Sequence, residues 1–218
     1  MIVASLGRWP IEEAALEGID AVELRLDLMG VSLTDLPEVA TAVTRRVPRL
    51  LATCRPGHAT EADRVALLSA AARLGAWAVD VELDAPPASR ATLIGAARSS
   101  GCTVIVSHHD HQGTPPRSAL ARIVRRSIAA GADIVKIACQ ARTLSDNATL
   151  LGLLDDGATA GRVAVVGMGP LGWVSRVVAP LLGSPLAFVS LGPGTETADG
   201  QPTRAALLSA WAALGVRP

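Results

Sequence analysis

Lys136 is the one lysine in the sequence, and it lies in the apolar stretch GADIVKIACQ at positions 131–140. A buried ammonium group costs free energy unless it has a partner, so a lysine in such a stretch calls for an explanation. A buried lysine can form an imine with a carbonyl group, and apolar surroundings and nearby cations both favour the nucleophilic free amine. Lys136 is therefore a candidate Schiff-base residue. The alternative is a partly buried lysine whose stem packs while its ammonium reaches solvent.

Other polar residues follow apolar runs in the same way. The run SHHD at 107–110 contains two histidines, and imidazole accepts and donates protons near neutral pH. Glu23 and Arg25 lie two positions apart in AVELRLD, so both face the same side of a strand, as substrate-binding groups or as a structural ion pair. Arg55 and Arg176 follow later runs and are candidate anion-binding groups unless they are solvated loop charges.

Eight short aliphatic runs supply the elements that must hold these residues. They cover residues 2–5, 21–27, 50–55, 78–83, 103–107, 133–139, 163–167 and 186–191. Between them lie segments with helical composition, several of which end in glycine, such as 61–75, 89–101, 115–131 and 201–215. Alternation of buried strands and helices predicts an α/β protein, a single (β/α)8 TIM barrel over residues 1–218. The rival fold, an open doubly wound sheet, usually carries a GxGxxG turn after its first strand, where this chain has SLGRWP.

The barrel prediction gathers the polar residues at one place. In a (β/α)8 barrel the chemistry takes place at the carboxyl ends of the strands. Arg55 ends its run, the histidines and Arg176 follow theirs, and Glu23, Arg25 and Lys136 lie within theirs. We therefore expect the carboxylates, arginines, histidines and Lys136 to surround one mouth of the barrel.

Composition limits the possible partners. The formal net charge is zero, so no overall basic field attracts nucleic acid or an anionic membrane. The opening MIVASLGRWP lacks a basic segment followed by a long apolar core, and no later run approaches membrane-spanning length, so we expect a cytoplasmic protein. The three cysteines lie far apart with no CxxC spacing, which favours buried thiols over a disulfide or metal site.

Taken together, the motifs resemble those of the type I 3-dehydroquinate dehydratases, a family of Schiff-base enzymes with a (β/α)8 fold. The family signature combines an Asp-aliphatic-acid-aliphatic run with a later Ser/Cys-x-His-Asp/Asn run, and it is matched by DVEL at 80–83 and VIVSHHD at 104–110. Further similar segments span nearly the whole chain, namely ELRLD, ATCR, DIVKIA, GMGPLGWVSR and TADGQ.

The resemblance implies a role for each matching position. Lys136 would form the imine with the ketone of 3-dehydroquinate, and His109 would move protons during loss of water to give 3-dehydroshikimate. The substrate is then a small molecule, no metal or organic cofactor is implied, and the family pattern implies a homodimer. The positions that match substrate-binding residues are Glu23, Arg25, Arg55, Met168, Arg176, Thr197 and Gln201.

Two departures from the family pattern affect these expectations. Where the family has a Glu that hydrogen-bonds the catalytic His, this chain has Ala59. Glu82, Glu61 or His58 could take over that task, and Glu82 is the first choice because it lies in the strand before the His strand. The chain also begins almost directly with its first strand, so we expect the hairpin that caps the barrel floor in longer relatives to be absent or shortened.

Three other functions remain as alternatives. The run SHHDHQ, with His109, Asp110 and His111, would suit a metal-dependent hydrolase if other ligands were present. A class I aldolase-type lyase would use the same buried lysine on the same fold. Ala59 leaves room for a divergent relative, or a pseudoenzyme, that acts on an altered dehydroquinate.

Overall fold

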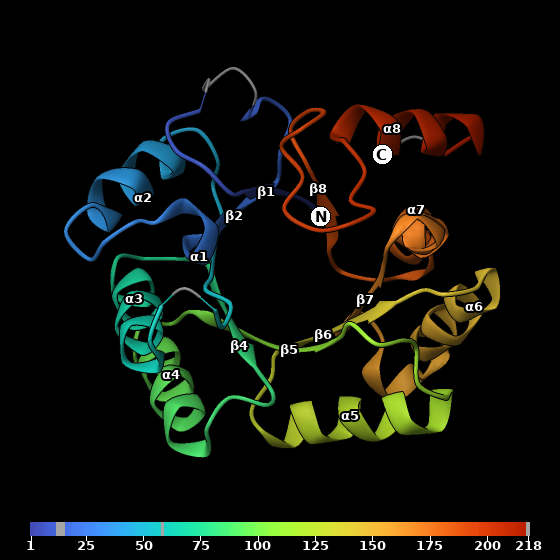
Figure 1. The fold of residues 1–218 in the computed structure, drawn as a ribbon, viewed down its shortest axis with the longest axis horizontal. Coiled ribbons are helices and arrows are strands. Elements are labelled where there is room, and N and C mark those ends of the chain that lie inside the picture. The colour runs from blue at the N-terminus through green and yellow to red at the C-terminus, as the bar shows by residue number, and fades with distance from the viewer. Residues whose placement is uncertain (12–15, 58, 217–218) are drawn as a thin grey trace.

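The computed structural model describes residues 1–11, 16–57 and 59–216 and contains one eight-stranded parallel sheet. The strands are β1 (Ile2–Leu6), β2 (Ala21–Arg25), β3 (Leu50–Thr53), β4 (Ala78–Glu82), β5 (Thr103–Asp110), β6 (Ile134–Gln140), β7 (Val163–Met168) and β8 (Ala187–Val189). Neighbours in the sequence pair in the sheet, and β8 pairs with β1. The sheet thus forms a nearly closed barrel whose seam lies between β7 and β8 (Figure 1), which confirms the predicted (β/α)8 fold.

The helices follow the strands and surround them on the outside, as Figure 1 shows. They are α1 (Leu26–Met29), α2 (Leu36–Thr44), α3 (Glu61–Arg73), α4 (Pro87–Ser99), α5 (Arg117–Ala129), α6 (Leu144–Leu151), α7 (Trp173–Val178) and α8 (Arg204–Ala213). Short 3-10 turns complete the chain: η2 (Gly152–Asp155), η3 (Gly157–Thr159), η4 (Pro170–Gly172) and η5 (Ala179–Leu182). Within the described residues, no helix has the length and apolar character needed to span a membrane.

Local sequence explains where the main helices begin and end. Thr60 and Thr203 cap α3 and α8 by accepting hydrogen bonds from the first-turn backbone amides of Asp63 and Ala206. Glycines in the left-handed conformation follow four of the predicted helical segments, at Gly75, Gly101, Gly131 and Gly215. The predicted role of glycine at these helix ends is therefore confirmed.

Some strand boundaries differ from those expected. The second run was predicted as a strand to residue 27, but β2 ends at Arg25 and Asp27 lies in α1. The Arg25 guanidinium donates two hydrogen bonds to the Asp27 carboxylate, and this contact accompanies the turn into the helix. In contrast, β5 extends to Asp110, three residues beyond its predicted end, because its last residues pair with β6. The described residues contain no strand ahead of β1.

The inside of the barrel changes from apolar to polar along the strands. Alternate residues of a strand face the same side. The inward-facing positions nearer the amino ends of the strands form an apolar cluster that includes Val3, Ala21, Leu51, Ala78 and Ile105. Two residues further along each strand, the inward positions are buried but polar: Ser5, Glu23, Thr53, Asp80 and Ser107, with Lys136 following Ile134 on β6. A separate and larger apolar cluster fills the space between the sheet and the helices.

Candidate active site

A cavity of about 860 Å³ opens above this polar layer at the carboxyl ends of the strands. All eleven site residues predicted from the sequence line it: Glu23, Arg25, Arg55, Glu61, Glu82, His109, Lys136, Met168, Arg176, Thr197 and Gln201. The eight strands thus bring together residues that are up to 178 positions apart, from Glu23 to Gln201. His58, the other possible partner of His109, lies outside the described residues.

Lys136 lies at the base of the cavity, and its side chain is 8 % exposed. Its Nζ is 3.4 Å from Asp80 Oδ2 and 3.7 Å from Glu23 Oε1, and it lies 4.1 Å from the centroid of the Phe188 ring. The charged atoms in direct contact with this amine therefore belong to two carboxylates. The ring adds a cation–π contact to the contacts with these two carboxylates.

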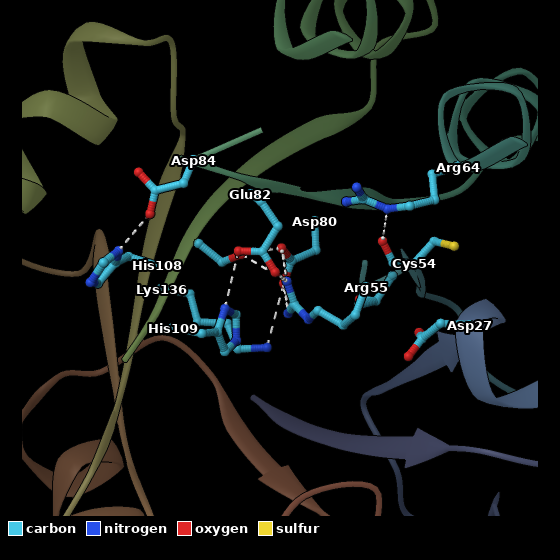
Figure 2. A network of polar contacts seen from close by, with 12 residues as sticks. Asp27, Cys54, Arg55, Arg64, Asp80, Glu82, Asp84, His108, His109 and Lys136 are labelled. Atoms are coloured by element: carbon cyan, nitrogen blue, oxygen red, sulfur yellow. Dashed lines mark hydrogen bonds and ion pairs between the residues drawn. The ribbon is translucent and has the colours of Figure 1, made fainter. Parts of the chain in front are cut away.

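Asp80 and Glu82 hold Arg55 in place (Figure 2). The guanidinium donates to both oxygens of Asp80, at 3.0 and 2.7 Å, and to Glu82 Oε1 at 2.6 Å. Burial disfavours the charged form of Arg55, but the two carboxylates outweigh burial and raise its pKa above the usual value. Ser107 also lies between these groups, within 2.9 Å of Arg55 Nη1. Much of the hydrogen-bonding capacity of Arg55 is therefore used within the protein.

Glu82 also contacts His109. Its Oε2 lies 3.2 Å from His109 Nδ1, and because a carboxylate only accepts, Nδ1 carries the hydrogen and Nε2 of the neutral ring keeps its lone pair. Burial opposes ionisation of Glu82, but the hydrogen bond with His109 and the charge of Arg55 lower its pKa to about 2. For His109, burial and the charge of Arg55 outweigh Glu82 and keep its pKa below the usual value. The neutral, proton-accepting ring is thereby favoured.

The other candidates for contact with His109 lie elsewhere. Glu61 is paired with Arg64 at the start of α3, and the Ala59 methyl group cannot accept a hydrogen bond. The neighbouring His108 turns away from this cluster and contacts Asp84, as Figure 2 shows. His111 lines the cavity, with its ring nearly parallel to that of His109 and 6.4 Å from it.

Arg176 differs from the other cations that line the cavity. Arg25, Arg55, Arg64 and Lys136 each form an ion pair with a carboxylate, whereas Arg176 has no such pair among the described residues. It donates only to the backbone oxygens of Gly167 and Asp199. The residue is 6 % exposed, and burial lowers its pKa to about 10 against the opposing charge of Asp199. A buried cation without a carboxylate partner provides a binding site for an anionic ligand.

The segment between β8 and α8 closes one side of the cavity. Gln201 accepts from the Thr197 backbone amide at 2.8 Å and donates to Ser5 Oγ at 3.1 Å. Arg25 donates to the Thr197 carbonyl at 2.9 Å, so β2 also holds this segment. Gly200 packs directly on the backbone of Gly169 after β7. These contacts place the Gln201 side chain against Ser5, with Thr197 beside it.

Sequence reasoning did not propose several residues of the site. Ser5, Asp80, Ser107 and Phe188 contact the predicted residues, yet none was named as a site residue. Two signals were available: Asp80 belongs to the DVEL motif, and Phe188 is the one phenylalanine of the chain, in its last strand. In the described part of the chain, no group of three or more His, Cys, Asp or Glu is placed to hold a metal ion, so the metal-hydrolase alternative finds no ligand set there.

Comparison with known proteins identifies the family. The family model for type I 3-dehydroquinase matches residues 9–218. The 3-dehydroquinate dehydratase of Methanosarcina mazei is 36 % identical over 217 residues, covering 92 % of this chain and 88 % of that protein. That of Halobacterium salinarum is 35 % identical, covering 95 % and 94 %. The fold resembles the type I 3-dehydroquinate dehydratase of Clostridium difficile with a TM-score of 0.84 at 23 % identity, covering 98 % of this chain and 91 % of that one. These matches favour the dehydratases over aldolase-type lyases, and the chain belongs to the type I 3-dehydroquinase family.

Proposed function

We propose that the protein is a hydro-lyase that converts 3-dehydroquinate into 3-dehydroshikimate through an imine on Lys136. The observation that carries this proposal is the position of His109 on β5 and Lys136 on the adjacent strand β6, with both side chains lining one cavity. An imine-forming amine and a proton-accepting imidazole are the two groups that such a dehydration needs. The family membership of the chain agrees with this activity.

Imine formation begins when the ammonium of Lys136 loses a proton. The nitrogen lone pair adds to the ketone carbon, and the carbonyl electron pair moves to oxygen. That oxygen takes up two protons, the one first released and one from the nitrogen, and leaves as water. The nitrogen keeps one hydrogen and a positive charge, so the iminium attracts electrons from the neighbouring carbon.

His109 then acts in elimination. Its Nε2 accepts a proton from the carbon beside the iminium carbon, and the C–H electrons move toward the nitrogen to give an enamine. The enamine expels the hydroxyl group from the next carbon, and the imidazolium protonates that oxygen so that it leaves as water. Hydrolysis of the remaining imine restores Lys136 and releases the conjugated ketone. Each proton that His109 accepts is thus returned within one turnover.

Arg176 is the residue we assign to the substrate carboxylate. It is the cavity cation without an ion pair among the described residues, and a guanidinium binds a carboxylate with two parallel hydrogen bonds. Gln201, Thr197, Glu23 and Arg25 surround the space beside it and are assigned to the hydroxyl groups of the substrate. Arg55 has part of its donor set free for the substrate, and Met168 packs against the ring.

The experiment that tests this proposal uses the fact that the chain has one lysine. With 3-dehydroquinate, absorbance of the conjugated enone should rise, and sodium borohydride added during turnover should inactivate the protein. Mass spectrometry should then find a reduced ligand adduct on the peptide that contains Lys136. The Lys136→Met variant is the control and should give neither signal. Turnover by the wild type without any adduct would remove the Schiff-base mechanism, and absence of both would remove the function.

We also propose that the protein acts in the cytoplasm as a homodimer and binds neither nucleic acid nor membranes. The surface that we assign to the dimer contact lies over η4, α7 and η5, where large apolar side chains are more than a third exposed: Leu171, Trp173, Val174, Leu181 and Leu182. Arg176 is the one charged residue between positions 163 and 182, and it points into the protein. A two-fold axis places a surface against its own copy, so an uncharged surface meets itself without repulsion between like charges.

A further inference from the structure

Asp80 is the buried carboxylate nearest to the reacting nitrogen. Its side chain has no exposed surface, and its Oδ2 accepts from Lys136 Nζ at 3.4 Å and from Arg55 Nη2 at 2.7 Å. Its other oxygen accepts from Arg55 Nη1 at 3.0 Å and from Ser107 Oγ at 2.5 Å. Four donors thus fix the position of this carboxylate, and three of them belong to cationic side chains.

Glu23, the other carboxylate near Nζ, is held differently. Its Oε1 is 3.7 Å from Nζ and accepts from Thr53 Oγ1 at 2.8 Å, while its Oε2 accepts from Ser5 Oγ at 2.5 Å. Both hydroxyl groups are neutral, and Ser5 in turn contacts Gln201. Glu23 is therefore tied to the part of the cavity assigned to the substrate, whereas Asp80 is tied to Arg55.

Imine formation passes through a stage at which a carboxylate beside Lys136 loses its partner. The ammonium at the start and the iminium at the end each carry one positive charge, but the amine that attacks the ketone is neutral. A buried carboxylate whose only partner was this nitrogen would be left uncompensated at that stage, at a cost in free energy. Arg55, with its two hydrogen bonds to Asp80, prevents this because its own charge is permanent.

We propose that Asp80, held ionised by Arg55, is the counter-ion of Lys136 and stabilises both its ammonium and the iminium formed from it. This inference rests on the proposed Schiff-base function and assigns a role to a residue beyond Lys136 and His109. It also assigns Arg55 the role of keeping Asp80 ionised, in agreement with the many hydrogen bonds that Arg55 makes within the protein. Burial opposes ionisation of Asp80, but Arg55 and Lys136 outweigh it and keep the Asp80 pKa below its usual value.

The surroundings of Nζ limit which other groups can produce the same effect. Among the described residues, the charged or titratable side chains that interact with it are Glu23 on β2, Asp80 on β4 and His109 on β5, while Arg55 after β3 and Glu82 on β4 line the same cavity. The remaining elements present uncharged side chains, namely Ser5 on β1, Val166 on β7 and Phe188 on β8. Asp80 and Glu23 are therefore the two candidates that a test must separate.

The test measures borohydride trapping of the Lys136 adduct against pH, at saturating 3-dehydroquinate. For Asp80→Asn, the pH midpoint of trapping should move to lower pH by one unit or more, a change of about tenfold or more in the fraction of free amine at a given pH. The trapped fraction on the alkaline side should fall, because the iminium has lost its counter-ion. A purely structural role would lower the amount of folded protein without moving the midpoint.

Two further variants separate the effect of charge from misfolding, and the effect of Asp80 from that of Glu23. Asp80→Glu retains the charge, so its midpoint should stay close to that of the wild type even where Asp80→Asn does not fold. Glu23→Gln should move the midpoint less than Asp80→Asn does. An unmoved midpoint in Asp80→Asn, a lowered midpoint in Asp80→Glu, or a larger shift in Glu23→Gln would each overturn the assignment. If the wild type itself gave no adduct, the proposed function would fail first, so the two failures are distinguishable.

Discussion

At the scale of single residues, the carboxylates of the cavity have more than one partner each. Glu82 places one oxygen on Arg55 and the other on His109, and Asp80 is shared between Arg55 and Lys136. Removing one such carboxylate therefore changes the electrostatic surroundings of several groups at once. Variants that keep the shape and remove only the charge are the appropriate probes.

Glu82→Gln should lower kcat, because the amide holds the His109 ring less firmly in its reactive orientation. A loss of up to about 100-fold is expected for such misplacement. Glu82 raises the His109 pKa whereas burial and Arg55 lower it, so loss of the Glu82 charge should move the His109-dependent limb of the rate profile to lower pH. Rate measurements across pH check both effects.

Glu61→Gln is the matched control for this variant, because Glu61 lines the same cavity but pairs with Arg64. It should leave kcat and the pH limb close to those of the wild type. If Glu61→Gln moved both and Glu82→Gln moved neither, Glu61 would be the partner of His109. If neither variant changed them, His109 would act without a carboxylate partner.

His109→Ala should separate proton transfer from imine formation. Turnover should fall by about 100-fold to 10,000-fold, the contribution of a positioned general base, while borohydride still traps an adduct on Lys136. His108→Ala and His111→Ala should be much milder, because His108 turns toward Asp84 and His111 lies at the exposed edge of the cavity. Should His111→Ala prove as damaging as His109→Ala and chelators inhibit the enzyme, a metal-based mechanism would replace this one.

At the scale of elements, the segment between β8 and α8 depends on close contact between two glycine backbones. Gly200 has a φ of +70° and touches the carbonyl group of Gly169, whose own φ is +79°. A side chain at position 200 would meet that carbonyl directly, and the neighbouring Thr197 and Gln201 would have to move. The glycine is thus required by space as well as by backbone conformation.

Gly200→Ala should therefore raise KM on the order of tenfold, because small displacements of substrate-binding groups weaken a fitted site strongly. Gly194→Ala is the control: it lies in the same segment at a φ of +78°, but an added Cβ meets nothing within 4 Å. Both variants should lose roughly 1–2 kcal/mol of stability from the left-handed conformation, and Gly200→Ala should lose more because its Cβ also overlaps the Gly169 carbonyl. Steady-state kinetics measures the KM values, and thermal unfolding measures the stability losses. Equal KM values in the two variants would contradict the role of the Gly169 contact.

At the scale of the whole molecule, the barrel places its chemistry at one end and its exposed apolar surface on one side. The 171–182 surface lies on the outside of the barrel over η4, α7 and η5, and Figure 1 shows α7 between α6 and α8. Arg176 comes from the same helix but points inward to the cavity. A dimer through this surface would therefore pack against the helix that carries Arg176.

Trp173→Arg combined with Leu182→Glu should convert the proposed dimer into monomers, because each change puts charge into a buried apolar contact. Sedimentation equilibrium of the wild type and the variant gives the masses directly. Leu214→Glu is the control, since Leu214 is 59 % exposed and lies after α8, outside the 171–182 surface. A monomeric wild type would exclude the dimer. A variant that stays dimeric would show that the dimer contact lies elsewhere.

The sequence by itself determined the fold class and predicted the residues that carry the chemistry. A lone lysine in an apolar run, two histidines in the SHHD run, and eight aliphatic runs are local patterns, so they could be read without knowing any long-range contact. Because strands of a barrel all end at one mouth, those patterns also predicted that the charged candidates and the histidines surround one mouth, while the family resemblance added Met168, Thr197 and Gln201; all eleven candidates line one cavity.

Only the tertiary structure decided which groups touch. The contact between Glu82 and His109 joins positions 27 residues apart, and the contact between Asp80 and Lys136 joins positions 56 residues apart. Arg55, Lys136 and His109 compete for Glu82 and Asp80, and strand register and side-chain rotamers, rather than residue type, settle such a competition. For the same reason the sequence named Arg176 only as a candidate anion-binding group alongside Arg55, and the folded chain distinguishes the two by leaving Arg176 buried and without a carboxylate partner among the described residues.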